Sequence, residues 1–316
     1  RTPSAGRVDR DGLVPRPARR RAPRGRAARG AEGSATAGTL TLDGGAGPDP
    51  ALLAEARRRL SAARRVLVLT GAGMSAESGV PTFRGEDGLW KGARPEELAT
   101  PEAFARDPDR VWEWYAWRRS LVSRCPPHAG HRALAAWVRR RAGSALLVTQ
   151  NVDGLHQAAA RAADDDPEGV IALHGDLFRV RCTGCGWETE DRSELGAGGK
   201  APRCSRCGAL LRPGVVWFGE ALPEAALRRA WSWALASDVA LTVGTSAVVH
   251  PAAALPRLVL GGEREHGQPG AQGCIIEVNL ESTPLTAQAA FSLTGAARSI
   301  LPALLDPGNS GPEGQV

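Results

Sequence analysis

The sequence predicts an α/β fold, a doubly wound parallel sheet of Rossmann-like type with a smaller module inserted into it. Three observations support this prediction. Short apolar, β-branched runs alternate with helix-like segments, polar or glycine-rich turns follow several of these runs, and two CxxC pairs interrupt the alternation. Such runs are typical of strands that are covered on both faces.

The expected elements follow one another in a regular order. An amphipathic helix is expected over 51–63 and a buried strand over 66–70, and further strands are expected over 145–149, 170–173, 239–243 and 274–278. Helices should lie between them. Because parallel strands place their carboxyl ends at one edge, the turns that follow four of the strands should converge on one ligand crevice. These turns are 71–75, 150–153, 244–246 and 279–281.

The turn after the first strand lies in the segment VLVLTGAGMSAESGVPTFRG, which starts at Val66. Gly71 and Gly73 lack the side chains that would keep backbone amides away from a pyrophosphate. We expect a helix to begin at Ser75, with its positive end toward the phosphates. Since GAGxS is not the full GxGxxG pattern, this turn alone leaves nucleotide binding and a plain turn both open.

Four of the six cysteines form two CxxC pairs separated by eighteen residues: Cys182, Cys185, Cys204 and Cys207. Two such knuckles can place four thiolates tetrahedrally around one zinc ion, with no open position for water. The metal should therefore be structural, so the inserted module is predicted to bind zinc. A zinc ribbon that binds nucleic acid is the alternative, but acidic residues between the pairs argue against it. They are Glu188, Glu190, Asp191 and Glu194.

Composition indicates a globular protein with an unusual N-terminal tail. Of 316 residues, 42% are hydrophobic and 23% charged, and the net charge is +6. Residues 1–46 contain ten Arg and four acidic residues, which accounts for this whole excess, so the core should not bind nucleic acid directly. The tail should be disordered, because it lacks apolar periodicity and contains four prolines. A mitochondrial transit peptide is the alternative, although these prolines and only two serines disfavour it.

The longest apolar region, 239–260, is interrupted by Gly244, His250, two prolines and Arg257, so no bilayer span and no membrane partner are expected. Paired CxxC motifs beside two isolated cysteines suit a reducing compartment better than a disulfide framework. We therefore expect a cytoplasmic protein, and a monomer.

Several motifs then occur in one order: GAGMSAESGVPTFR from Gly71, TQNVDGLH from Thr149, LHGD from Leu173 and the two CxxC pairs. In this order the chain resembles the sirtuin family of NAD-dependent protein lysine deacylases, over roughly 60–305. The resemblance implies a tail (1–48), a catalytic domain (49–305) and a flexible C-terminus (306–316). Within the catalytic domain, 49–84, 126–175 and 215–305 would form the Rossmann-like part. The segment 85–125, which includes a helical cofactor-loop segment, and the zinc module 176–214 would form the small domain.

The resemblance also implies the reaction and its base. NAD would be a consumed co-substrate, with nicotinamide and an O-acyl-ADP-ribose as products. His174 would be the catalytic base, its ordinary pKa suiting proton transfer near neutrality. A lone histidine after a strand is otherwise a structural residue, which is how His131, His156 and His250 are interpreted.

The expected NAD site collects residues from all four turns. Asn151 and Asp153 would offer an amide and a carboxylate to the nicotinamide end, a helix cap being the alternative for Asp153. Phe83 and Arg84 would order NAD and shield the reactive ribose carbon. The full set is Gly71, Ala72, Gly73, Ser75, Phe83, Arg84, Gln150, Asn151, Asp153, Gly244, Thr245, Ser246, Asn279, Glu281 and Ala297.

The acyl-lysine substrate would bind the segment 215–220, with Val216, Phe218 and Gly219 pairing to the peptide as an added strand. Tyr115 and Arg118 lie three apart, so one helix face can present a hydroxyl and a guanidinium to a carboxylate. The desuccinylase and demalonylase branch of the family carries this pair. The alternative is that Tyr115 packs in a tryptophan-rich core while Arg118 is solvated. Glu86 would repel an acidic acyl group if its carboxylate pointed inward.

The resulting prediction is an NAD-dependent protein lysine deacylase that removes succinyl, malonyl or glutaryl groups, with some deacetylation. A deacetylase and a mono-ADP-ribosyltransferase of the same fold are alternatives. A redox dehydrogenase would need the full GxGxxG and a hydride-accepting substrate site. A zinc-dependent binding module would not need Asn151, Asp153 and His174 together.

Overall fold

The computed structural model describes residues 47–82, 95–193, 195–196, 198–261 and 273–306. The expectations for the tail, for Phe83 and Arg84, and for the carboxylate of Glu86 lie outside these ranges.

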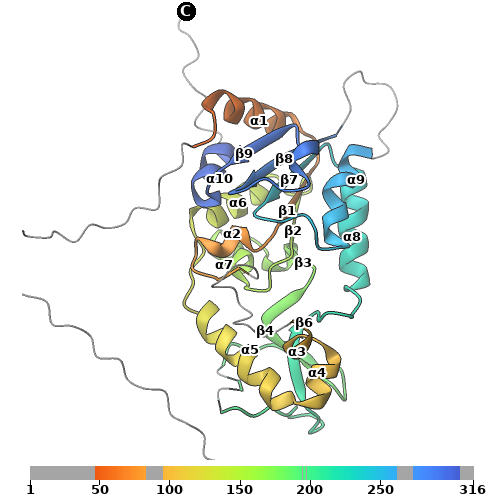
Figure 1. Ribbon diagram of the computed structural model, residues 1–316. Coiled ribbons are helices and arrows are strands. Elements are labelled where there is room, and N and C mark those ends of the chain that lie inside the picture. The colour runs from red at the N-terminus through yellow and green to blue at the C-terminus, as the bar shows by residue number, and fades with distance from the viewer. Residues whose placement is uncertain (1–46, 83–94, 194, 197, 262–272, 307–316) are drawn as a thin grey trace, which may run out of the picture. The chain divides into compact units, whose positions relative to one another are not determined.

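The larger sheet has six strands in the order β3-β2-β1-β7-β8-β9, and all of its pairings are parallel (Figure 1). Three of its central strands are apolar and buried along their whole length, as expected for strands covered on both faces. The strands are β1 (Val66–Thr70), β2 (Ala145–Thr149), β3 (Ile171–Ala172), β7 (Val239–Val243), β8 (Cys274–Asn279) and β9 (Phe291–Thr294).

Two helix layers cover this sheet, because successive strand side chains point to opposite faces. Val66 and Val68 share a core with α1 (Pro50–Ala62), α6 (Ala129–Arg140) and α10 (Ala297–Leu305). Leu67 and Leu69 pack in a second core with α8 (Glu224–Leu235) and α9 (Leu255–Gly261). Figure 1 shows the two sets of helices on opposite sides of the strands.

A smaller antiparallel sheet has the strand order β5-β4-β6 and packs against helices in a third core. Its strands are β4 (Gly175–Cys182), β5 (Glu188–Glu190) and β6 (Leu211–Val215), and the other helices are α2 (Gly73–Ala76), α3 (Pro95–Leu98), α4 (Pro101–Arg106), α5 (Pro108–Val122) and α7 (Leu155–Ala162). Short 3₁₀ turns occur at Pro167–Gly169, Ala252–Ala254 and Thr286–Gln288.

Helix α5 is attached to the module by side chains that bond to its backbone. The indole of Trp112 donates to the Leu211 carbonyl at 2.7 Å, and Arg119 donates to the carbonyls of Leu177 and Ser193. Because these bonds are buried or half-buried, they hold α5 firmly on the strands β4 and β6 of the smaller sheet.

Most expected elements are confirmed, and the exceptions have local reasons. The strands over 66–70, 145–149 and 239–243 have the expected bounds, whereas β3 at the sheet edge has only two residues. The helix expected over 51–63 starts at Pro50, because Asp49 accepts a hydrogen bond from the Ala51 amide. The helix expected to begin at Ser75 is wrong: α2 is a single turn that ends at Ala76. The chain then turns at Gly79, whose φ is +89°.

Of the helices within the described ranges, none combines the length and the apolar character that crossing a membrane requires.

Candidate functional site

The order of the larger sheet reverses between β1 and β7, because β2 and β3 follow on one side and β8 and β9 on the other. In doubly wound folds, ligands bind at the carboxyl ends of the strands at such a switch point. Here the two neighbouring turns are joined directly: the Gly71 amide donates to the Val243 carbonyl at 3.0 Å, and the Gly73 amide donates to the Gly244 carbonyl at 2.8 Å. The glycine turn therefore lies at the position where a dinucleotide is expected.

The glycines of these turns are required first by backbone packing. A Cβ on Gly71 would lie 2.8 Å from the Gly244 carbonyl oxygen, and one on Gly244 would lie 2.2 Å from the Met74 amide. Gly244 also has φ of +58°. The expected reason, access of amides to a pyrophosphate, therefore accounts for only part of the pattern. The amides of Gly71 and Gly73 are bonded between the loops, and within the described residues the Ala72 amide is not.

Side-chain amides connect the turns across the crevice. Gln150 donates to the Thr245 hydroxyl at 2.9 Å, Asn279 donates to the Thr245 carbonyl at 3.0 Å, and Asn151 donates to the Gly71 carbonyl at 2.9 Å. The structure therefore brings together the residues that the sequence assigned to one crevice from four strand ends.

Ser75 and Asp153 are buried side chains next to Asn151. The Asn151 amide donates to the Ser75 hydroxyl at 3.2 Å, and this hydroxyl lies near enough to the Asp153 carboxylate to act on its pKa. Asp153 also accepts from the Leu155 amide at 2.9 Å, but the N-cap of α7 is Gly154, which has no side-chain cap bond. The helix-cap alternative is therefore wrong, although Asp153 does bond to the first residue of α7. Burial raises the pKa of Asp153, although the Leu155 amide and the Ser75 hydroxyl oppose this shift.

Three neighbouring histidine rings, inclined to one another, contact the glycine turn through Met74 and Ser75, and the sequence analysis missed one of them, His128. The rings of His128 and His131 lie 4.2 Å apart, and those of His131 and His156 lie 4.9 Å apart. His156 bonds to the Thr70 hydroxyl at 2.9 Å, and burial lowers its pKa to about 3. The interpretation of His131 and His156 as structural residues is therefore confirmed, while His250 is exposed.

His174 follows β3 and is oriented by its neighbours. Its Nδ1 lies 2.9 Å from the Gln150 carbonyl oxygen, which can only accept, so Nδ1 carries the proton. Burial lowers the pKa of His174, and the Gln150 carbonyl opposes this shift. The imidazole is thus neutral near pH 7, and its Nε2, which no described residue engages, has a lone pair that can take a proton.

Tyr115 and Arg118 lie together on α5, and both are buried, at 1% and 4% exposure. The Arg118 guanidinium lies 5.5 Å from the Tyr115 ring centroid and 4.7 Å from that of Trp114. Burial lowers the pKa of Arg118, and the neighbouring Tyr115 and Asp153 oppose this shift. The alternative of a solvated Arg118 is therefore wrong, although Tyr115 does pack among tryptophans.

The sequence analysis missed a second polar group beside Tyr115. The indole of Trp217 donates to the Tyr115 hydroxyl at 2.9 Å. Trp217 lies under the guanidinium of Arg212, which forms an ion pair with Glu220. Only a resemblance drew attention to the segment 215–220, and nothing in it indicated a partner 102 residues away on α5.

The remaining predicted residues have varied surroundings. The Val216 amide donates to the His174 carbonyl at 2.9 Å. The Phe218 amide donates to the Ala99 carbonyl, and Phe218 as a whole is 56% exposed. Ala297 is buried at the start of α10. Gly219, Ser246 and Glu281 are exposed.

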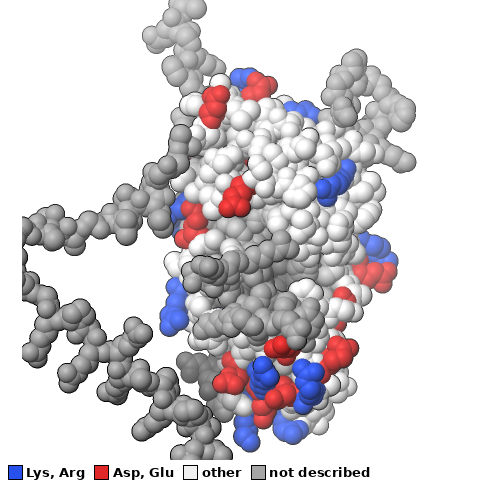
Figure 2. Space-filling model, in the orientation of Figure 1, with Lys and Arg blue, Asp and Glu red and all other residues white. Residues whose placement is uncertain are grey.

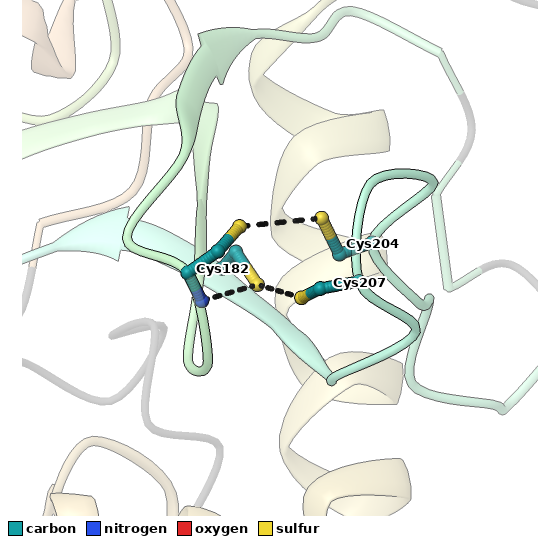
Figure 3. A group of neighbouring side chains, drawn as sticks. Cys182, Cys204 and Cys207 are labelled. Atoms are coloured by element: carbon teal, nitrogen blue, oxygen red, sulfur yellow. Dashed lines mark hydrogen bonds between the residues drawn. The ribbon is translucent and has the colours of Figure 1, made fainter.

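The four cysteines of the CxxC pairs meet between two turns of the smaller module (Figure 3). Their sulfur atoms all lie within 4.8 Å of one another, with Cys182 and Cys207 at 3.4 Å and Cys185 and Cys204 at 3.8 Å. A tetrahedral zinc ion with Zn–S bonds of about 2.3 Å requires sulfurs about 3.8 Å apart. The set therefore fits one structural zinc, and amides of Gly184 and Cys185 point at the Cys182 sulfur.

Comparison with known proteins agrees with this geometry. The model of the Sir2 family matches residues 71–251, which include the glycine turn, the segment with His174 and both cysteine pairs. The chain belongs to the Sir2 family. The matched residues contain both the glycine turn of the crevice and the cysteine cluster.

Relatives and solved structures of the Sir2 family are similar over most of the chain. An NAD-dependent protein deacylase of Pyrococcus furiosus is 46% identical over 81% of this chain and 97% of its own length, and one of Thermus thermophilus is 49% identical over 81% and 94%. A crystal structure of a Sir2 homolog–NAD complex has a TM-score of 0.70 at 46% identity, and covers 80% of this chain and 92% of its own.

Proposed function

We propose that this Sir2-family chain is an NAD-dependent protein deacylase in which His174 is the base. The observation that supports it most is the protonated Nδ1 of His174 against the Gln150 carbonyl, because it leaves Nε2 as a neutral acceptor beside the switch point. When bound, NAD supplies the electrophilic ribose carbon and nicotinamide as the leaving group. The chain's own residues orient that nucleotide, exclude water and remove one proton.

The residues proposed for the NAD site are those that connect the loops. Gly71, Ala72 and Gly73 would receive the phosphates, and Asn151 and Asp153 would line the nicotinamide end. Thr245 and Asn279 would hold the adenosine half, with Ser246 and Glu281 exposed beside them. Because Asn151 already bonds to Gly71 and Ser75, and Asp153 to the Leu155 amide, this end of the site is formed before a ligand arrives.

For the substrate, we propose an acyl-lysine peptide on the Val216–Gly219 segment, with an acidic acyl group bound by Tyr115 and Arg118. The burial of Arg118 supports this proposal, since a buried guanidinium is best stabilised by a carboxylate. Desuccinylation or demalonylation should then exceed deacetylation. A deacetylase is the second candidate, because the segment that would bind the peptide does not depend on the acyl group.

We further propose that the enzyme is a monomer with 49–305 as its catalytic domain and that it acts in a reducing compartment, as its free cysteines favour. No nucleic-acid partner is proposed for the core. On the face shown in Figure 2, basic and acidic side chains are interspersed and form no single basic patch on the described surface.

The test measures nicotinamide release with NAD and matched succinyl-, malonyl-, glutaryl- and acetyl-lysine peptides. Release should require an acyl-lysine peptide, and His174→Ala should abolish it, while His131→Asn reports what disturbance of a buried histidine alone does. Undiminished release by His174→Ala would refute the assigned base. Faster turnover of the acetyl peptide than of all acidic peptides would refute the acyl preference.

A further inference from the structure

The hydroxyl of Tyr115 lies between two groups that can only donate hydrogen bonds. The Trp217 indole N–H donates to its oxygen at 2.9 Å, and the Arg118 guanidinium lies nearby, 5.5 Å from the Tyr115 ring centroid. Neither group has an acceptor. The indole therefore occupies one lone pair of the phenolic oxygen, and since neither neighbour can accept the hydroxyl proton, that proton can bond to a third partner.

We propose that Trp217 is a positioning residue for acyl selectivity: its indole holds the Tyr115 hydroxyl as an acceptor, so that the hydroxyl proton faces the acyl group. This inference rests on the acyl-lysine site proposed above. In that arrangement the Tyr115 proton and the Arg118 guanidinium are both donors toward the acyl pocket. A carboxylate satisfies two donors, whereas the methyl group of an acetyl satisfies none.

Trp217 can act in this way because its own position is tightly fixed. It is 3% exposed, its amide donates to Glu220 at 2.8 Å, and the Arg212 guanidinium lies 3.5 Å from its ring centroid. Arg212 bonds to both carboxylate oxygens of Glu220, so the ion pair is bidentate. The indole also lies 5.3 Å from the Phe104 ring, centroid to centroid.

The same segment also connects to the proposed base. Val216, next to Trp217, donates its amide to the His174 carbonyl at 2.9 Å. The Tyr115 hydroxyl and the backbone of His174 are therefore both hydrogen-bonded to the neighbouring residues Val216 and Trp217. Phenylalanine at this position would keep an aromatic ring but provide no donor, so the Tyr115 hydroxyl could rotate.

The decisive variant is Trp217→Phe, compared with Trp112→Phe as a matched control. Trp112 is as deeply buried, and its indole also donates one hydrogen bond, but to the Leu211 carbonyl instead of Tyr115. We expect Trp217→Phe to lower the ratio of kcat/KM for succinyl over acetyl peptide by roughly five- to tenfold. Trp112→Phe should leave this ratio within about twofold of wild type.

A double variant separates positioning from general damage. If Trp217 acts through the Tyr115 hydroxyl, the pair Tyr115→Phe and Trp217→Phe together should have the same selectivity ratio as Tyr115→Phe alone. Additive losses, or equal losses of Trp217→Phe on both peptides, would overturn the inference.

A spectroscopic readout is independent of turnover, because Tyr115 is the only tyrosine of the chain. With ¹³Cζ-labelled tyrosine, the single resonance should shift in Trp217→Phe and stay unchanged in Trp112→Phe. An unchanged resonance in Trp217→Phe would refute the indole bond. A shifted resonance in an enzyme whose wild type prefers acetyl peptide would instead refute the acyl preference and, with it, the role of Trp217 in selectivity.

Discussion

Replacing Arg118 by methionine tests the acyl site most directly. The guanidinium is 4% exposed and approaches Tyr115, so a carboxylate bound there would be bonded in a largely dry environment. Hydrogen bonds to charged groups contribute about 1.5–3 kcal/mol, which corresponds to roughly 10- to 150-fold in kcat/KM. We therefore expect Arg118→Met to lower desuccinylation by this factor.

Deacetylation by Arg118→Met should be unchanged or improved, because methionine keeps much of the apolar stem and removes a buried cation that an acetyl group cannot pair. The assay is nicotinamide release with succinyl and acetyl peptides at subsaturating concentration. The matched control is Arg119→Met, whose guanidinium bonds to carbonyls of the smaller module. This control should lower stability and affect both peptides alike. Equal losses on both peptides in Arg118→Met would remove the case for a carboxylate site.

Three further predictions concern stability. Gly244→Ala should lower the free energy of unfolding by about 2 kcal/mol or more, because its Cβ would lie 2.2 Å from the Met74 amide. A Cβ on Gly198 would have nothing within 4 Å, so Gly198→Ala should change this free energy by no more than about 0.5 kcal/mol. Urea titrations measure both. Removing zinc with a chelator should lower the Tm and weaken the preference for succinyl peptide. The reason is that hydrogen bonds to the zinc module hold α5, which carries Tyr115 and Arg118, in place. A metal-free protein with an unchanged Tm would contradict this. Burial lowers the pKa of His156 from 6.5 to about 3, so its stabilising contribution should be complete above pH 6.5 and decline as the pH falls toward 3. His156→Asn should reduce that decline, and an identical pH profile of the unfolding free energy would be evidence against it.

The sequence predicted best what local pattern determines. Continuous apolar runs such as 66–70 and 239–243 are strands with the expected bounds, because a strand buried on both faces has no other pattern. The spacing of the four cysteines predicted their cluster, because two CxxC knuckles place four thiolates around one metal ion. The smaller strands β4–β6 and the edge strand β9 were not predicted, since their polar and apolar residues mix and their pairing is decided by tertiary contacts.

The sequence predicted which turns lie together at the site, but not which residues contact one another there. The sequence did not show that the backbones at Gly71 and Gly244 approach too closely for a side chain on either residue. A glycine in a sequence does not tell whether the missing Cβ makes room for a ligand or for another loop. Trp217 was missed because its proposed role depends on a hydrogen bond to the Tyr115 hydroxyl of α5, which is distant in sequence.

The segment Val215–Glu220 connects two features that sequence analysis treated separately. Val216 bonds to the His174 carbonyl, and Trp217 bonds to the Tyr115 hydroxyl, so neighbouring residues contact the proposed base and the proposed acyl site. Changes at the Tyr115 hydroxyl should therefore alter acyl selectivity, because that hydroxyl bonds to Trp217 of this segment. Changes that move the segment, such as loss of the Arg212–Glu220 pair, should alter selectivity and the rate of the proton-transfer step together.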